Sequence, residues 1–185
     1  MIQQEFVING LKLFWLIRPD VHDIERLEKI FPFHPFVIES IKAPTLHPLI
    51  EDYDDHLFII LRLPIIYQTR QANNIAEVDF LITKNILVII TYIDFRDLNE
   101  ILGNVSGGYV AQKDILRLRE NHTGHLLYLI IDHLFQKLIH NLDIMEEEIT
   151  KIEDKIFQKH DHAMVEEISH VRRDILDFKR PRNPL

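Results

Sequence analysis

The sequence predicts an α+β protein with α/β/α layers, in which a mixed sheet covered by helices is followed by a long acidic helical hairpin. Three observations predict this class. Short β-rich runs alternate with helix-periodic stretches over residues 1–108. Apolar residues at helical spacing then continue well past the usual helix length within residues 109–160. A second helical series occupies residues 161–185. We therefore expect an α/β domain, a long helix that packs on it and projects from it, and the beginning of a second long helix.

The composition is that of a folded, acidic, globular protein. The 185 residues are 46% hydrophobic and 27% charged, with a net charge of −8 and no cysteine. An acidic chain lacks the basic face that nucleic acid requires, and the missing cysteines exclude disulfides and thiolate metal sites. No apolar run approaches the ~20 residues of a membrane span, and the N-terminus lacks a signal-peptide pattern. The chain as given is expected to be soluble and cytosolic.

The first predicted elements are a strand and two helices. Apolar residues alternate with period two at Leu11, Leu13, Trp15 and Ile17, which indicates a half-buried strand. Asp20 is a candidate N-cap for a helix whose inward stripe is Ile24, Leu27 and Phe31 and which Pro32 ends. A shorter helix is predicted over residues 35–41, with Pro35 in its first turn.

Three further strands and a helix complete the predicted sheet layer. Residues 57–61 are continuously apolar, as in a central strand covered on both faces. Residues 78–82 and 86–90 flank the tripeptide 83–85 and predict a hairpin. A helix is expected over residues 94–102. Three of the five glycines fall in residues 103–108, and we interpret that stretch as the boundary of the domain.

The long helix and the helix after it are predicted from two apolar series. The first runs through Leu127, Ile131, Leu134, Leu138, Leu142, Met145, Ile149, Ile152 and Ile156. The second runs through Met164, Ile168, Val171, Ile175 and Phe178. At 1.5 Å per residue the first helix would be on the order of 45 Å long, too long to bury inside a domain of this size. The second series ends with no capping glycine, so we expect a piece of a longer protein.

The motifs of common enzymes are missing, so we expect no enzymatic activity. The sequence lacks G-x-S-x-G, a P-loop, a dinucleotide fingerprint and H-E-x-x-H. Eleven histidines make zinc worth weighing. His133 and His140 are roughly 10 Å apart along one helix, too far to share one ion. His160 and His162 fit a solvated turn better than a zinc site, because a zinc site needs three or four converging ligands. His34 is interpreted as a structural residue at a helix entry.

Acidic residues gather on the first long helix. They are Asp132, Asp143, Glu146, Glu147, Glu148, Glu153 and Asp154. Most fit a solvated face paired with lysines at i+4, and the alternative is a loose oxygen-lined surface for Mg²⁺. Asp132 differs because it lies in a largely apolar stretch, where a carboxylate needs a partner.

Six segments of the chain resemble segments of the cytoplasmic domain of the CorA family of magnesium and cobalt channels, and they follow one another in the same order as in that family. They are FPFHPFVIESI (31–41), PLIEDY (48–53), LITKNIL (81–87), LLYLIID (126–132), DIMEEEI (143–149), and RRDIL (172–176) with Pro184. The resemblance covers nearly the whole chain. It implies a cation-sensing domain on the cytoplasmic side of a cell-membrane protein, whose stalk helix continues beyond Leu185 into membrane helices.

The resemblance also implies ligands and partners. Glu39 and Asp132 match family positions that line a cation site between subunits, so they are the predicted metal ligands. The cation is expected to be weakly bound Mg²⁺, with Co²⁺ or Zn²⁺ as alternatives. Ser40 stands where family members often carry aspartate, which puts the main regulatory site in doubt.

The full-length protein is expected to be a homo-oligomer, pentameric by resemblance, that binds no nucleic acid. Two alternatives are a ZntB-like zinc transporter and a free-standing cytosolic interaction domain.

Overall fold

A computed structural model describes residues 4–8, 10–45, 47–64, 75–106 and 122–158. The chain forms two compact units. One comprises Met1–Ile65 with Ile75–Leu134, and the other Ile66–Asn74 with Phe135–Leu185. The predicted boundary near residue 108 lies outside the described residues, so the division at 108 and 160 stays a prediction.

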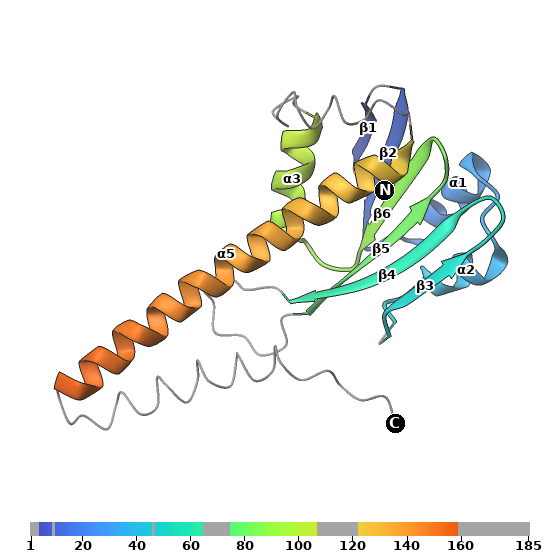
Figure 1. The fold of residues 1–185 in the computed structure, drawn as a ribbon. Coiled ribbons are helices and arrows are strands. Elements are labelled where there is room, and N and C mark those ends of the chain that lie inside the picture. The colour runs from blue at the N-terminus through green and yellow to red at the C-terminus, as the bar shows by residue number, and fades with distance from the viewer. Residues whose placement is uncertain (1–3, 9, 46, 65–74, 107–121, 159–185) are drawn as a thin grey trace. The chain divides into compact units, whose positions relative to one another are not determined.

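The first unit is built on one mixed sheet of six strands in the order β1-β2-β6-β5-β4-β3 (Figure 1). The strands are β1 (Gln4–Ile8), β2 (Leu11–Ile17), β3 (Leu49–Asp52), β4 (Leu57–Pro64), β5 (Ile75–Ile82) and β6 (Ile86–Thr91). Only β2 and β6 pair in parallel, while the other four neighbouring pairs are antiparallel. The predicted hairpin around residues 83–85 is confirmed, and it supplies the two central strands β5 and β6.

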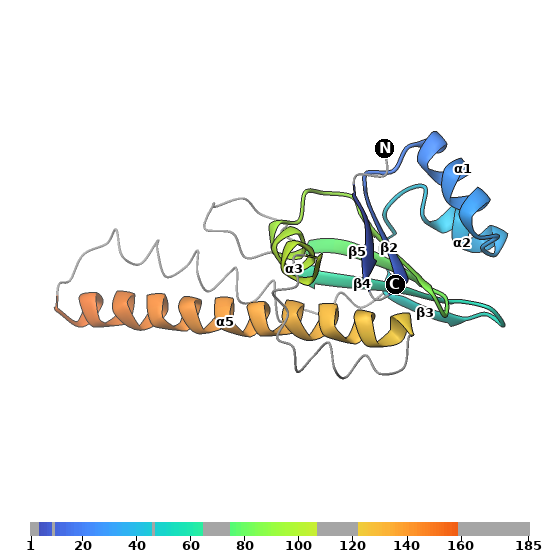
Figure 2. The same ribbon diagram turned by 90° about the horizontal axis from the view of Figure 1, so that it is seen from above.

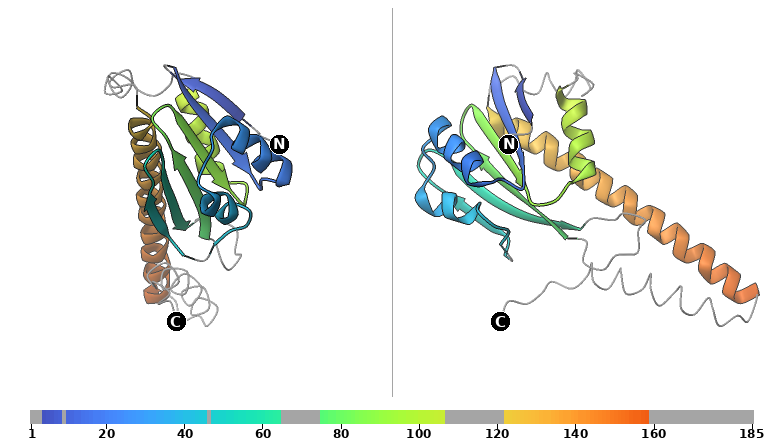
Figure 3. Two further views of the ribbon diagram at one scale, coloured as in Figure 1. Left: turned by 90° about the vertical axis from the view of Figure 1, so that its right-hand side faces the viewer. Right: turned by 180° about the vertical axis from the view of Figure 1, so that it is seen from behind.

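Helices cover both faces of this sheet. Helices α1 (Val21–Ile30) and α2 (Pro35–Ser40) lie on one face, and α3 (Arg96–Ser106) lies on the other with the first turns of α5 (Thr123–Gln158) (Figures 2 and 3). The predicted α+β class with α/β/α layers is therefore confirmed for the described residues.

The face under α1 and α2 carries a well-packed apolar core. Its largest members are Phe14, Phe33 and Phe58, and Leu27, Val37 and Ile41 contribute from the helical layer with almost no exposure.

Asp20 caps α1 as predicted. Its Oδ1 accepts from the Asp23 backbone N–H at 2.9 Å, and the Asp23 carboxylate accepts from the Asp20 N–H at 3.2 Å. This reciprocal pair satisfies two N–H groups that a helix start otherwise leaves open.

Two sequence predictions about these elements were wrong, and two strands were missed. Strand β2 is buried on both faces and not on one, because Phe14 and Leu16 belong to the core under α1 and α2, and Leu13 and Trp15, which point to the opposite face, are buried as well. Helix α3 extends through Gly103, which was assigned to a flexible break. Burial of Leu98 and Leu102 outweighs the ~1 kcal/mol cost of a helical glycine. The edge strands β1 and β3 were not predicted.

The long helix begins four residues earlier than the predicted apolar series, at Thr123 instead of Leu127. Thr123 is fully buried, and its hydroxyl donates to the Thr83 carbonyl while its N–H donates to the Lys84 carbonyl at 3.2 Å. The turn between β5 and β6 thus fixes the start of α5. This anchoring depends on a contact across 40 positions of sequence, which no local pattern reveals.

The second unit, within the described residues, consists of α5 from Phe135 to Gln158. The whole helix has 36 residues, which corresponds to about 54 Å at 1.5 Å per residue. An ion pair at i,i+4 joins Lys151 and Glu147 at 3.5 Å, as predicted for the acidic face. The second series at Met164, Ile168, Val171 and Ile175 lies outside the described residues.

Candidate functional site

Glu39, the first predicted cation ligand, lies in the last turn of α2. Its side chain is exposed and forms an ion pair with Lys42, three residues later. Ser40 does not extend the site, because its hydroxyl donates back to the Phe36 carbonyl at 2.9 Å. A divalent cation at Glu39 would therefore meet one carboxylate that an ammonium group already neutralises.

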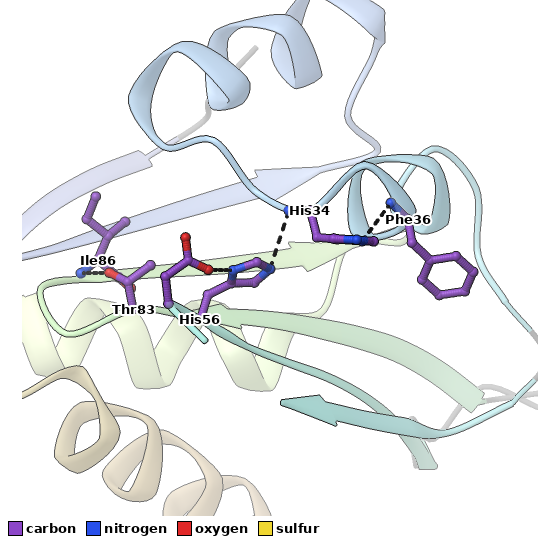
Figure 4. A network of polar contacts seen from close by, with 6 residues as sticks. His34, Phe36, His56, Thr83 and Ile86 are labelled. Carbon is purple, nitrogen blue, oxygen red and sulfur yellow. Dashed lines mark hydrogen bonds and ion pairs between the residues drawn. The ribbon is translucent and has the colours of Figure 1, made fainter. Parts of the chain in front are cut away.

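The N-terminal end of α2 is fixed by two histidines (Figure 4). His34 is the N-cap, and its Nδ1 accepts from the Phe36 N–H at 3.2 Å, which confirms the structural role predicted for this residue. The buried His56 accepts from the His34 N–H at 3.5 Å through Nε2, and its Nδ1 donates to Asp55 at 2.5 Å. The Tyr53 ring stacks between both imidazoles, with centroids 4.8 and 4.6 Å away. The turn between β3 and β4 thereby holds the start of α2.

The C-terminal end of α2 is fixed by Tyr92, which follows β6. Its Oη lies 3.2 Å from the carbonyl oxygen of Ile41, the C-cap residue of α2, and 2.8 Å from Oδ2 of Asp79. Helix ends leave carbonyls without intrahelical partners, so this hydroxyl supplies a donor where α2 needs one. Arg18 fixes Tyr92 in turn, because its Nε donates to the Tyr92 carbonyl at 3.0 Å.

Two buried acids of β5, Glu77 and Asp79, lie beneath this end of α2. They are two residues apart and so face the same side of the sheet. Glu77 accepts from the Thr45 N–H at 2.6 Å and contacts the Thr45 hydroxyl at 3.4 Å, which fixes the loop after α2. Burial raises the pKa of Glu77, while these Thr45 hydrogen bonds and the charge of Arg62 on β4 act to lower it. Both acids therefore stabilise the segment that follows Glu39.

The carboxyl of Asp79 is strongly perturbed by its burial. It has no solvent exposure, and its Oδ1 has no hydrogen-bond partner. Burial raises the pKa of Asp79 to about 7, the Tyr92 hydrogen bond acts to lower this pKa, and the nearby Glu77 charge acts to raise it. Near neutral pH a substantial fraction of Asp79 is therefore protonated.

Asp132, the second predicted ligand, lies on α5 and is half-buried. It makes a hydrogen bond or an electrostatic interaction, as expected for a carboxylate in an apolar stretch. The buried stripe of the helix includes Ile130 and Leu134. Asp132 instead shares the opposite stripe, by three-four spacing, with three exposed large apolar residues, Tyr128, Phe135 and Ile139.

The structure does not bring Glu39 and Asp132 together within one chain. Helix α2, which carries Glu39, lies on one face of the sheet, and the first turns of α5, which carry Asp132, lie on the other (Figure 3). Among the described residues, no group of three or more His, Asp and Glu side chains is placed to hold a metal ion. A site that uses both residues requires two copies of the chain.

Sequence reasoning missed the residues that hold α2 in place, His56, Glu77, Asp79 and Tyr92. A signal existed for Asp79, since it is the one ionisable residue within the apolar run 78–82. A charged residue at a core-facing position of a central strand needs a dedicated partner.

The described part of the chain contains no helix that is long and apolar enough to cross a membrane.

The fold and its long helix define an α+β domain of a type already known from soluble parts of metal-ion transport proteins. The structure is similar to the soluble domain of CorA from Methanocaldococcus jannaschii, with a TM-score of 0.68 and 20% identity, over 90% of this chain and 64% of that one. It is also similar to the ZntB cytoplasmic domain from Vibrio parahaemolyticus, with a TM-score of 0.67 and 18% identity, over 94% of this chain and 65% of that one.

The profile of the family described as CorA-like Mg²⁺ transporter protein matches residues 10–185, so the chain belongs to this family. The resemblance inferred from the sequence is thereby confirmed. One curated relative is the cobalt/magnesium transport protein CorA of Thermotoga maritima, which is 21% identical over 91% of this chain and 46% of its own length. The chain spans about half the length of the curated relatives it matches.

Proposed function

We propose that this chain is the cytoplasmic, cation-sensing part of a magnesium and cobalt transporter that acts in a cell membrane as a homo-oligomer, pentameric at full length. Family membership over residues 10–185 is the observation that carries this proposal. In this function, Mg²⁺ bound between copies holds the assembly closed, and loss of Mg²⁺ frees the domains to move. The cation shifts the population through its different affinity for the two arrangements.

The proposed cation site joins Glu39 of one copy to Asp132 of another. Two features support it. The two carboxylates lie on opposite faces of one sheet, so neighbouring copies can contribute one each. Asp132 is also flanked by the exposed side chains of Tyr128, Phe135 and Ile139, an apolar surface that suits contact between protein chains. Mg²⁺ keeps much of its water shell and needs only one or two carboxylates, so we expect weak, roughly millimolar binding.

Zinc transport is the second candidate function. The similarity to the ZntB cytoplasmic domain, at a TM-score of 0.67 over 94% of this chain, matches the similarity to CorA domains. Transport assays with Mg²⁺, Co²⁺ and Zn²⁺ in turn separate the two functions.

A free-standing interaction domain is tested by reading the gene past Leu185. Two apolar segments of about 20 residues, with Gly-Met-Asn, the signature of the CorA family, at the end of the first, would exclude it.

The cation site is tested by protease protection of the full-length protein over a magnesium titration. Ser40→Asp should lower the protective concentration, because it adds a carboxylate beside Glu39. The double change Glu39→Ala with Asp132→Ala should raise it. Equal protective concentrations in the wild type and both variants would show that these residues are not the sensor, and the acidic face of α5 would become the next candidate.

A further inference from the structure

The two contacts of the Tyr92 hydroxyl are best satisfied by a second hydrogen, and among the described residues Asp79 is placed to supply it. The Tyr92 hydroxyl has a single hydrogen, yet its oxygen lies 3.2 Å from the Ile41 carbonyl and 2.8 Å from Asp79 Oδ2, and both of these oxygens are acceptors when Asp79 is ionised. A protonated Asp79 resolves the conflict. Its Oδ2–H donates to Tyr92, and the Tyr92 O–H donates to Ile41, so every hydrogen has an acceptor.

The remaining oxygen of Asp79 favours the same protonation state. Oδ1 is buried and has no hydrogen-bond partner. An unpartnered oxygen is far less costly on a neutral carboxyl than on a carboxylate, which carries half of a full charge there. Both oxygens of Glu77, in contrast, have a neighbouring donor: one accepts from the Thr45 N–H at 2.6 Å, and the other lies 3.4 Å from the Thr45 hydroxyl, which also lies 3.3 Å from the His47 carbonyl. Among the described residues, the unpartnered oxygen is therefore a feature of Asp79 and not of Glu77.

Among the described residues, few charged groups lie near Asp79, and one of them, Arg18, contacts the backbone of its partner Tyr92. Glu77 on β5 and Arg62, opposite Glu77 on β4, are the charged groups of the neighbouring strand positions, and Tyr92 is the titratable group beyond β6. On the helices above this face, Asp23 of α1 is buried and caps its own helix. At the end of α2, Glu39 and Lys42 are exposed and paired with each other.

We propose that neutral Asp79 is a positioning residue for Glu39: it frees the Tyr92 hydrogen to hold the Ile41 carbonyl, and loss of its proton releases the end of α2. When Asp79 ionises, the Tyr92 O–H donates to the carboxylate and no longer to Ile41. The hydroxyl oxygen of Tyr92 and the carbonyl oxygen of Ile41 then face each other with no hydrogen between them. The cation part of this inference rests on the proposed function of Glu39. The consequence is that cation affinity falls as the pH rises. The raised pKa of Asp79 places the change near neutral pH.

The release of α2 is tested by hydrogen exchange of this chain without any cation. Protection factors correct the measured exchange rates for the intrinsic exchange rate of each amide at that pH. We expect the protection factors of residues 36–45 to fall by roughly two- to tenfold between about pH 6 and pH 8.5. This factor corresponds to the net free energy of one hydrogen bond. Asp79→Asn should stay protected at both values, because its amide donates to Tyr92 at any pH. Glu28→Gln removes an exposed carboxylate on α1 and should behave as the wild type does. Equal pH dependence in wild type and Asp79→Asn would overturn the proposal.

The link to the cation is tested separately, with magnesium chloride and the full-length protein. In the wild type, the magnesium concentration that protects against protease should rise between about pH 6 and pH 8.5 by the same factor as the fall in hydrogen-exchange protection. In Asp79→Asn this concentration should change less. An identical shift in both proteins, with the exchange result intact, would overturn the positioning role of Asp79 toward Glu39. No magnesium protection at either pH would overturn the proposed function, while the exchange result would still support the release of α2.

Discussion

The side chain of Lys42 controls what a cation meets at Glu39. Its ammonium neutralises the carboxylate from three residues away, on the exposed end of α2. Exposed ion pairs contribute at most about 1 kcal/mol, so a cation can displace Lys42 at modest cost. The composition of this one turn is therefore expected to weaken cation binding at the proposed site, where Glu39 alone would carry a full negative charge.

We expect Lys42→Gln to lower the magnesium concentration that protects the full-length protein, by up to roughly fivefold, because a lost exposed pair corresponds to at most about 1 kcal/mol. Lys29→Gln, which removes an exposed lysine in the last turn of α1, is the matched control and should have little effect. If the two variants lower the protective concentration equally, the effect is one of net charge and not of the pair with Glu39.

Asp79 makes the stability of the fold depend on pH. Its pKa is raised from 3.8 to about 7 by burial, so the folded chain binds this proton more tightly than the unfolded chain. The stability from this proton is fully present below about pH 4 and is lost as the pH rises through about 7. Over that window the single group lowers the free energy of unfolding by on the order of 1–4 kcal/mol.

Asp79→Asn should remove this loss, because the amide is neutral at every pH. Its free energy of unfolding, measured in urea, should exceed that of the wild type by on the order of 1–4 kcal/mol at pH 8, with the gap closing toward pH 4. Glu28→Gln should show no such pH-dependent gap. A constant difference between Asp79→Asn and the wild type at all pH values would mean that Asp79 is ionised in the fold.

At the scale of the element, α2 is defined by its ends. A helix of six residues has no stability of its own, so contacts from other elements determine its position. The turn between β3 and β4 contributes His56 and Tyr53, the end of β6 contributes Tyr92, and β5 contributes Glu77 through Thr45. Glu39 is therefore presented by a segment that several strands hold, which makes its position sensitive to a change in any of them.

Helix α5 offers a test of which stripe faces the domain. Ile130 is fully buried and Ile139 is 58% exposed on the same helix. Ile130→Ala should lower the free energy of unfolding by about 2–4 kcal/mol through lost burial and the cavity left behind, and Ile139→Ala should change it by less than about 0.5 kcal/mol. Urea unfolding of the two variants measures the contrast. Equal losses would show that the Ile139 stripe is covered in the folded chain.

At the scale of the whole molecule, the sheet keeps the two predicted ligands apart. One chain presents Glu39 on one face and Asp132 on the other, so the proposed cation links copies and does not stabilise a single chain. Cation binding is then coupled to assembly, and a weak site in an isolated chain is compatible with a clear effect in an oligomer.

If the proposed full-length protein is an oligomer, we expect this 185-residue chain alone to be monomeric or weakly associated, because the proposed membrane part would supply much of the contact between copies. Light scattering at micromolar concentration measures this. A tight pentamer of the isolated chain would contradict the expectation and would assign the assembly contacts to the residues present here.

The sequence alone determined the elements with strong local signals. Asp20 and the spacing of Ile24 and Leu27 predicted α1, the tripeptide 83–85 predicted the central hairpin, and three-four spacing predicted that α5 is a long helix, although not its start at Thr123. These signals are local, since caps, turns and helical periodicity depend on residues a few positions apart. Six ordered segments also identified the family, which the profile match confirms.

Only the tertiary structure decided how distant residues meet. It paired β2 with β6 in parallel across more than 70 positions, buried β2 on both faces, and set Tyr92 against Ile41, 51 positions away. It also placed Glu39 and Asp132 on opposite faces of the sheet. Sequence patterns report which side of an element is apolar, whereas the partner of a buried polar group depends on long-range packing. Asp79 shows the difference, because its environment is created by β6 and the end of α2.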